Sequence, residues 1–307
     1  MIVPASVGVG ELCGVLAALT WSVSALLFSR LGERMSGGAM SLGKTLSAAL
    51  MLTSTHLALA ALRGAPSIPP ALREQPGALL AMSAVIGLTL GDTALFGAMT
   101  LIGAPRALLI HASAPVFATI GGLLFLGERP DARSLVGVLI TVTGIATVVS
   151  ARPTGREVPP ADARKGLILG MIAAMSQAAG SLLSRRAMQQ DVAPLAAASF
   201  RLIVGGGALF VLAAPTGHTR RWVAELTHER RWLKVAGASF IGTYLGLWLA
   251  QTSLQRASSA GVASTLLATT PVFLLPLAHA TGAERMTARA SVGVLVALVG
   301  VGVLSLR

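Results

Sequence analysis

Ionisable side chains are rare inside the apolar stretches of this sequence, and these few residues are the ones best able to do chemistry. They are Lys44, His56, Asp92, His111, Arg201 and His279. Asp92 is the one carboxylate well inside an apolar run, and Arg201 follows nine uncharged residues. Charges in apolar surroundings are costly and are typical of ion pairs, proton relays and solute pathways. Asp92 could couple proton movement or act as a counter-ion, and a static pair with Lys44 or Arg201 is the alternative.

Polar and aromatic residues add further candidates for lining an interior pathway. Tyr244, Trp248 and Gln251 are spaced i, i+4, i+7 and therefore share one helix face. Trp21 and Gln177 occupy equivalent positions in two halves of the chain. Rings and amides on an inward face suit a solute with an apolar or cationic portion, and anchoring at the membrane interface is the alternative for the tryptophans. His111 could titrate near neutral pH or be a hydrogen-bonded structural residue.

The composition decides which kind of protein positions these residues. Of 307 residues, 54% are hydrophobic and only 12% are charged, whereas soluble domains average about 25% charged residues. The apolar runs are long enough to cross a bilayer as helices. They are Leu12–Ser29, Thr45–Leu62, Gln75–Gly91 continuing past Asp92, Ala107–Gly127, Ser134–Ala151, Gly166–Ser184, Val192–Thr219, Val235–Gln255, Ala257–Ala283 and Ala290–Leu306. The pattern predicts an all-α integral membrane protein with ten transmembrane helices, and it disfavours a soluble enzyme, a disordered chain and a nucleic-acid binder.

An internal repeat divides the ten predicted spans into two sets of five. A shift of 156 residues places Ala-Pro-Val-Phe at 114–117 on Thr-Pro-Val-Phe at 270–273, and Glu128-Arg129 on Glu284-Arg285. The same shift places Gly137 on Gly293 and Gly144 on Gly300. Because five is odd, the second repeat must enter the membrane from the opposite side, which is the construction typical of secondary transporters. We predict repeats at 8–151 and 164–307.

Two prolines fall at equivalent places inside the fourth and ninth predicted spans. Pro115 and Pro271 cannot donate a backbone hydrogen bond, so the carbonyls of His111 and Leu267 are partly freed. In a bilayer such groups need a protein or water partner, so the irregular backbone should face a cavity or a neighbouring helix. These prolines are therefore candidates for a kink that gates the pathway, and a purely packing kink is the alternative.

The segments 114–144 and 270–300 resemble the end of the EamA repeat of the drug/metabolite transporter superfamily. There, a proline-containing fourth helix ends in Gly-Glu-Arg and precedes a Gly-rich fifth helix, and this chain differs only in Ala283 before Glu284. The resemblance implies a five-plus-five arrangement, an inner-membrane location and movement of small metabolites, often export. For Glu128, Arg129, Glu284 and Arg285 we expect structural roles in capping and ion pairing at helix turns.

The expected function is therefore a secondary active transporter, in the export direction, of small metabolites or drug-like solutes. The solute would bind near the bilayer midplane, with alternating access driven by a proton or counter-solute. We expect membrane lipids as partners and no nucleic acid, cofactor, metal or catalytic residue, and the oligomeric state stays open. Cys13 is the single cysteine, so no intramolecular disulfide forms. The alternative is an integral-membrane scaffold or lipid-modifying enzyme whose repeat is only architectural.

The charge distribution and the family resemblance point to opposite orientations in the membrane. With a cytoplasmic N-terminus, the inner gaps hold eight basic residues, including the C-terminal Arg307, and the outer gaps hold fourteen. The positive-inside rule therefore favours an external N-terminus, whereas the resemblance implies cytoplasmic termini. We follow the resemblance. A reporter fused at Arg307 that is active only outside the cell would overturn this orientation.

Overall fold

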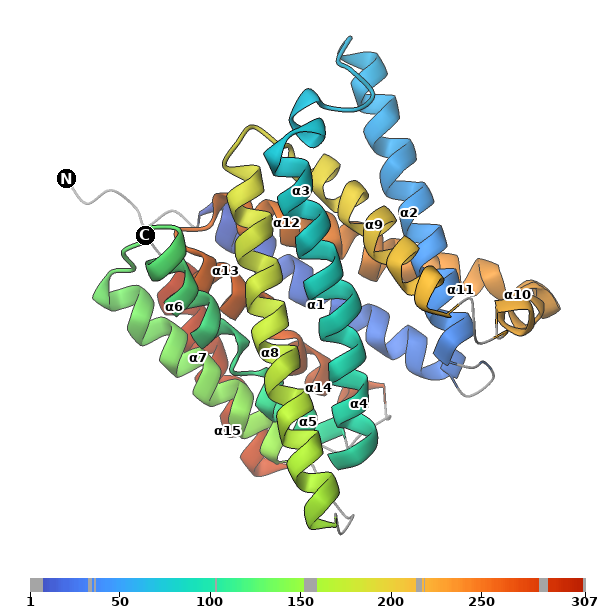
Figure 1. Ribbon diagram of the computed structural model, residues 1–307. Helices are drawn as coiled ribbons and strands as arrows, with labels where there is room; N and C mark the ends of the chain where they lie inside the picture. Colours follow the sequence, from blue (N-terminus) through green and yellow to red (C-terminus); the bar gives the residue numbers. More distant parts are fainter. Residues whose placement is uncertain are drawn as a thin grey trace.

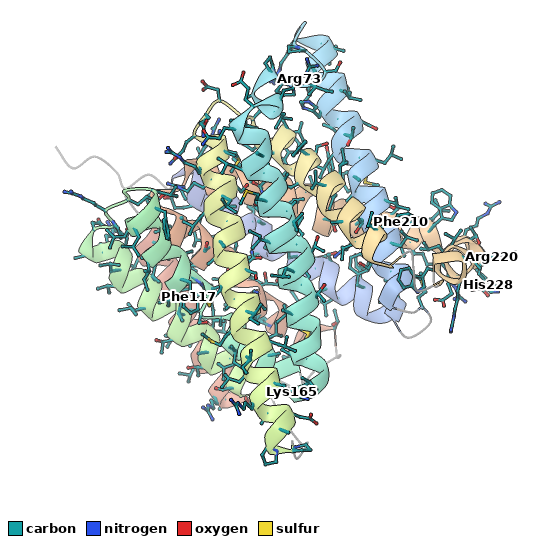
Figure 2. All side chains as sticks on the ribbon, viewed as in Figure 1. Arg73, Phe117, Lys165, Phe210, Arg220 and His228 are labelled. Atoms are coloured by element: carbon teal, nitrogen blue, oxygen red, sulfur yellow. The ribbon has the colours of Figure 1, made fainter. Side chains whose placement is uncertain are left out.

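The computed structural model describes residues 8–32, 35, 37–102, 104–151, 159–213, 217, 219–281 and 287–305, and it is a bundle of helices (Figure 1). Within these ranges nine helical segments are long and apolar enough to cross a membrane, and Ala288–Leu304 forms a shorter apolar helix. The predicted all-α membrane fold is confirmed. We call side A the end of the bundle with residues 63–74, 126–131 and 257–259, and side B the opposite end. Figure 2 shows Arg73 near side A and Lys165 near side B.

The first repeat crosses the bundle five times, and its third and fourth crossings are irregular. Its elements are α1 (Val9–Gly32), α2 (Gly37–Leu62), η1 (Pro70–Arg73), α3 (Gln75–Ser83), η2 (Ala84–Gly91), α4 (Asp92–Ile102), α5 (Ala104–His111), α6 (Ala114–Phe125) and α7 (Ala132–Ser150). The third crossing runs through α3, η2 and α4, with η2 wound as a π-helix. The fourth crossing consists of α5 and α6.

The second repeat has the same irregularities at equivalent places. Its elements are α8 (Pro160–Met188), α9 (Pro194–Ala213), α10 (Thr219–Thr227), η4 (His228–Arg230), α11 (Arg231–Ser239), η5 (Phe240–Leu245), α12 (Gly246–Arg256), α13 (Ala260–Leu267), α14 (Thr270–Ala280) and α15 (Ala288–Ser305). The segment η5 is also a π-helix, and it begins 156 residues after η2. Short π-helical segments interrupt α-helices frequently at functional sites.

The predicted proline kinks are complete breaks in both helices. The turn at 112–113 separates α5 from α6, and the turn at 268–269 separates α13 from α14. Pro115 and Pro271 therefore lie in the first turn of a new helix rather than inside a continuous one, where a missing N–H costs nothing. The Thr270 hydroxyl donates to the Leu267 carbonyl at 3.2 Å. The carbonyl that Pro271 leaves without its helical partner therefore has a hydrogen bond from a neighbouring residue.

The two repeats interlock because the first helix of each packs on the third crossing of the other. In α1, Ser24 and Trp21 fill the space left open by Gly242 and Gly246. On the other side of the molecule, α8 packs on η2 and α4. There Ser83 donates to the Gly180 carbonyl at 2.5 Å. Small residues at these crossings let the backbones approach closely, which replaces the hydrophobic force that is missing in lipid.

The fifth helices, α7 and α15, pack directly against each other along a glycine seam. A Cβ atom added to Gly144 would overlap the backbone of Ala297, and one added to Gly300 would overlap Thr141. These glycines correspond under the 156-residue shift, so each repeat contributes the same close contact. The seam joins the two repeats along most of the length of both helices, as α7 and α15 show in Figure 1.

We expect Gly144→Ala to lower the free energy of unfolding by about 1–3 kcal/mol, because the new methyl group forces α7 and α15 apart. Gly302→Ala is the matched control, since its Cβ would have open space around it on α15. Thermal and denaturant unfolding of the purified protein in detergent measures the difference. Equal stability of the two variants would show that the seam is not tightly packed.

Candidate functional site

Three of the predicted ionisable residues are neighbours inside the bundle. Lys44 lies on α2, Asp92 begins α4 directly after η2, and Arg201 lies on α9. The carboxylate of Asp92 interacts electrostatically with both cations. The other predicted ionisable residue near mid-helix, His111, ends α5 at the break before α6. The structure thus brings the charged candidates of both repeats together around η2.

Arg201 is buried to 6% exposure, and its guanidinium group lies next to a glycine. A Cβ atom added to Gly87 in η2 would lie 3.5 Å from the Nη2 atom of Arg201 and 3.5 Å from the Cα atom of Gly180. The guanidinium group therefore lies beside the crossing of η2 and α8. Because it projects from α9 towards this crossing, Arg201 contacts the irregular third crossing of the first repeat.

The aromatic candidates form a second group, on η5 and α12. The Tyr244 ring is stacked on Phe240 with centroids 5.1 Å apart, and it meets Trp248 edge-on at 6.2 Å. The Tyr244 hydroxyl and the Thr55 hydroxyl of α2 lie 3.0 Å apart in a hydrogen bond. Tyr244 and Trp248 belong to one hydrophobic cluster together with Leu202 of α9. The aromatic group therefore lies beside the helices that carry Lys44 and Arg201.

The remaining pathway candidates are spread over other contacts. Trp21 packs against Gly246, and Gln177, its counterpart on α8, is half-buried. Gln251 is fully buried and accepts a hydrogen bond of 2.5 Å from the Ser184 hydroxyl. The i, i+4, i+7 face predicted from Tyr244, Trp248 and Gln251 therefore separates into an aromatic part against α2 and α9 and an amide bound to α8.

At side A, a polar network joins the two repeats, and among its residues the sequence predicts a role only for Glu128. The Nε atom of Arg185 on α8 lies 2.5 Å from the Oε1 atom of Glu128, which follows α6. Arg185 also donates to the Leu254 and Ala257 carbonyls at 2.6 and 3.1 Å. The ion pair thus fixes a cation at the C-terminal end of α12, where it compensates the helix dipole.

At the α12–α13 junction, backbone N–H groups donate hydrogen bonds to two carboxylates of the first repeat. Glu128 Oε2 accepts from the Ala260 backbone N–H at 2.8 Å, at the beginning of α13. Glu11 Oε1 accepts from the Ser258 N–H at 3.1 Å. Glu128 thus satisfies an N–H group that the start of α13 leaves without a partner, and Glu11 binds the backbone just before the N-cap residue Ser259. We call Glu11, Glu128, Arg185 and residues 254–260 the side-A latch, since it ties the first repeat to the α12–α13 junction.

Gly127 explains how Glu128 reaches the latch. Its φ is +66°, a left-handed conformation in which a side chain is strained, and the Glu128 N–H then donates back to the Gly122 carbonyl at 3.0 Å. The chain therefore reverses after α6 and directs the carboxylate towards α13. In the Gly-Glu-Arg segment, Glu128 pairs with Arg185 and accepts from the Ala260 N–H, and both of these residues are in the other repeat. Its counterparts Glu284 and Arg285 lie outside the described residues.

We expect Gly127→Ala to lower the free energy of unfolding by about 1 kcal/mol, because alanine disfavours the left-handed region. No atom lies within 4 Å of the added Cβ position, so the effect is conformational rather than steric. Gly237→Ala also meets open space, but Gly237 is within α11, where alanine is favoured. Opposite signs of the two effects in a thermal unfolding assay are expected; destabilisation of both would contradict this explanation.

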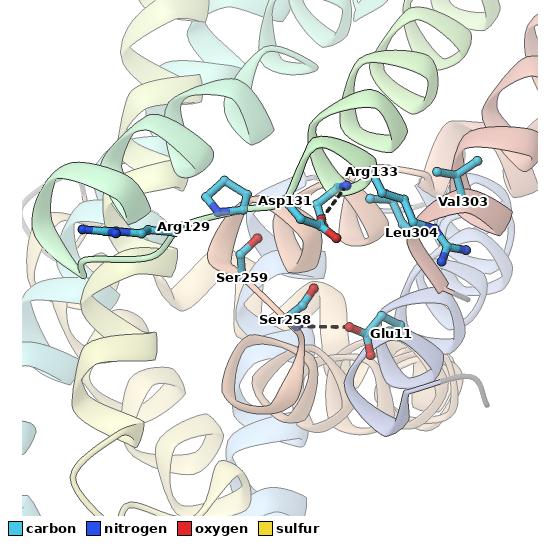
Figure 3. A pocket seen from close by; sticks show the side chains of 10 residues that line it. Glu11, Arg129, Asp131, Arg133, Ser258, Ser259, Val303 and Leu304 are labelled. Carbon is cyan, nitrogen blue, oxygen red and sulfur yellow. Dashed lines mark hydrogen bonds between the residues drawn. The ribbon is translucent and has the colours of Figure 1, made fainter. Parts of the chain in front are cut away.

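A pocket of about 340 Å³ opens beside the latch at side A (Figure 3). Its walls come from α1, the segment between α6 and α7, the α12–α13 junction and the end of α15. The lining residues are Glu11, Arg129, Pro130, Asp131, Arg133, Ser134, Ser258, Ser259, Val303 and Leu304. Asp131 caps α7, and hydrogen bonding to Ser134 holds the pKa of its carboxyl below the usual range. Of the predicted pathway residues, none lines this pocket.

The comparison with known families decides what kind of protein this is. A model of the EamA-like transporter family matches residues 8–150 and 164–306. The chain belongs to the EamA-like transporter family. This EamA-like chain is therefore a multi-pass integral membrane protein of the drug/metabolite transporter superfamily, built from two EamA repeats.

Other comparisons bear on the fold of the EamA-like chain. No curated protein matches it. A solved structure described only as "Crystal structure of protein" is 19% identical and aligns with a TM-score of 0.73. The alignment covers 97% of the EamA-like chain and 96% of the other. At this identity the likeness shows a shared fold and nothing about the solute.

Proposed function

We propose that the chain is a secondary active transporter that exports small metabolites or drug-like solutes across the inner membrane by alternating access. The observation that carries this proposal is the side-A latch. It joins two interlocked repeats through an ion pair and backbone hydrogen bonds, which can break and re-form as one repeat rocks against the other. The buried charges around η2 support a solute or ion site between the repeats, since such groups inside a membrane are typically functional.

A proton is the coupling ion that the residues favour. Asp92 is a carboxylate between two cations, and protonation would change how strongly it holds Lys44 and Arg201. The chemistry of the site therefore allows proton binding and solute binding to influence each other. We propose this coupling for the transport cycle, with a counter-solute as the other driving gradient.

Reconstituted vesicles test the transport proposal directly. Purified chain in proteoliposomes should give saturable uptake of one or more members of a radiolabelled panel of organic acids, amino acids, sugars and organic amines. Uptake should rise when a pH gradient or a preloaded counter-solute is imposed. Protein-free liposomes are the control. Fluxes equal to those of protein-free liposomes for the whole panel and both gradients would overturn the proposal.

For the orientation we propose cytoplasmic termini, as the family resemblance implies. The charge distribution points the other way: Lys165 and Arg220 are exposed towards side B, whereas Arg185 at side A is buried in the latch. Arg307 lies outside the described residues. A reporter fused after it should be active inside the cell, and activity only outside would overturn this orientation.

A further inference from the structure

Arg201 is a buried cation whose guanidinium group is left without a hydrogen bond in the described part of the chain. It is 6% exposed, and its Nε atom has no hydrogen-bond partner. Within the described part of the chain, no hydrogen bond or ion pair to its guanidinium group is present. Burial of a charge is costly unless the charge is paired and hydrogen-bonded. Asp92 acts on Arg201 electrostatically but without a hydrogen bond, so we expect the hydrogen-bonding partner of Arg201 to come from outside the chain.

The charges around Arg201 do not balance. Lys44 and Arg201 are two cations, and Asp92 is the carboxylate that interacts electrostatically with both. In the described residues, Asp92 forms no direct ion pair with either cation. One carboxylate that contacts neither cation directly leaves an excess positive charge around Lys44 and Arg201 in an apolar bundle. An added anionic group would neutralise that excess.

The neighbours of this site suit a particular kind of anion. Gly87 keeps the region beside Nη2 free of a side chain. On the neighbouring face of α9, Leu202 belongs to the cluster with Tyr244 and Trp248. A solute that reaches Arg201 therefore meets charge on one side and an apolar, aromatic surface on the other.

We propose that the transported solute is a small organic anion whose carboxylate, sulfonate or phosphate group binds Arg201. This rests on the proposed transport function and assigns its substrate class. The planar guanidinium group presents two parallel N–H donors to such oxyanions. Lys44 supplies the second positive charge, the rings of Tyr244 and Trp248 pack against the apolar part of the solute, and Asp92 competes for the same cations in the empty protein.

Binding to the purified chain in detergent tests the substrate class. The probes are benzoate, benzenesulfonate and phenyl phosphate, with benzyl alcohol and benzylamine as neutral and cationic counterparts. One or more of the acids should raise the unfolding temperature in a saturable manner, and the counterparts should not. Arg201→Gln should weaken that binding roughly 10- to 100-fold, as expected for losing a charged hydrogen bond. Lys44→Gln should weaken it less, and Lys165→Gln, on the exposed start of α8, should not change it.

The variant is expected to fold, because Arg201→Gln removes an unpaired buried charge. Its unfolding temperature without probe should equal or exceed that of the natural chain, and Arg201→Lys should keep part of the affinity. The proposal is overturned if none of the acids stabilises the chain more than its counterparts do, or if Arg201→Gln binds the acids as well as the natural chain.

Uptake measurements with Arg201→Gln in proteoliposomes test the anion site and the transport function separately. Saturable uptake of neutral or cationic panel members that Arg201→Gln leaves unchanged would overturn the anion assignment and support transport. Acid binding that depends on Arg201 in a chain without any mediated flux would support the anion site and overturn transport. Acid uptake that Arg201→Gln abolishes would support both.

Discussion

Replacing Arg185 by glutamine lowers the free energy of unfolding by about 3–5 kcal/mol, because the change leaves a buried carboxylate without its counter-charge. Arg185 is paired with Glu128 at 2.5 Å, and the two side chains are 8% and 11% exposed. The variant also loses the donors to the Leu254 and Ala257 carbonyls. Chemical unfolding of the purified chain in detergent measures the loss.

Arg186 provides the matched control, since it is adjacent in sequence but exposed. We expect Arg186→Gln to change stability by less than about 0.5 kcal/mol. The double variant Glu128→Gln with Arg185→Gln should lose less than the sum of the single changes, because the two residues act as a pair. Similar losses in the free energy of unfolding for Arg185→Gln and Arg186→Gln would show that the latch does not stabilise the folded protein.

Asp92→Asn should abolish transport driven by a pH gradient while the protein stays folded. Asparagine is close in size to aspartate but cannot exchange a proton at this position, so the coupling between proton and solute is lost. Uptake across an imposed pH gradient in proteoliposomes measures the effect. Exchange against a preloaded counter-solute should survive, since it requires no net proton movement.

Asp191→Asn is the control for this change. Asp191 is exposed at side A and has a φ of 59°, a conformation that asparagine tolerates. We expect gradient-driven uptake by this variant to match that of the natural chain. Unchanged uptake by Asp92→Asn would remove Asp92 from the coupling mechanism.

The repeat and the spans could be predicted because they depend on features that persist along the chain. A bilayer demands long apolar segments, and an odd number of spans per repeat fixes the inverted arrangement. The grouping of Lys44, Asp92 and Arg201 could be predicted as well, because charged residues are so rare in these spans that few ion pairs are possible. The prolines indicated an irregular helix, but the change from a kink to a complete break depends on packing around residues 112–113 and 268–269.

Of the latch, the sequence predicts only a capping and ion-pairing role for Glu128, because its other residues look ordinary in the sequence. Arg185 and Arg186 form a basic pair near the end of a span, which is the usual mark of a membrane boundary. Neighbouring residues point about 100° apart on a helix, so only one of the two arginines can face α12. Which one is buried is decided by how α8 packs on α12, and the sequence does not show this. Glu11 likewise resembles an acidic first-turn residue. The π-helices η2 and η5 left no clear signal, although their equivalent positions follow from the repeat.

Whether side A must open for transport is the central question, and a reversible cross-link answers it most directly. In a Cys13→Ser background, Arg129→Cys and Ser258→Cys place two thiols in the side-A pocket, on opposite repeats. Uptake of the solute panel into proteoliposomes is measured before and after treatment with a cleavable bifunctional thiol reagent, with the single-cysteine variants as controls. Alternating access predicts that the cross-link stops uptake and that cleavage restores it. Uptake that continues unchanged with side A cross-linked would contradict alternating access through this latch.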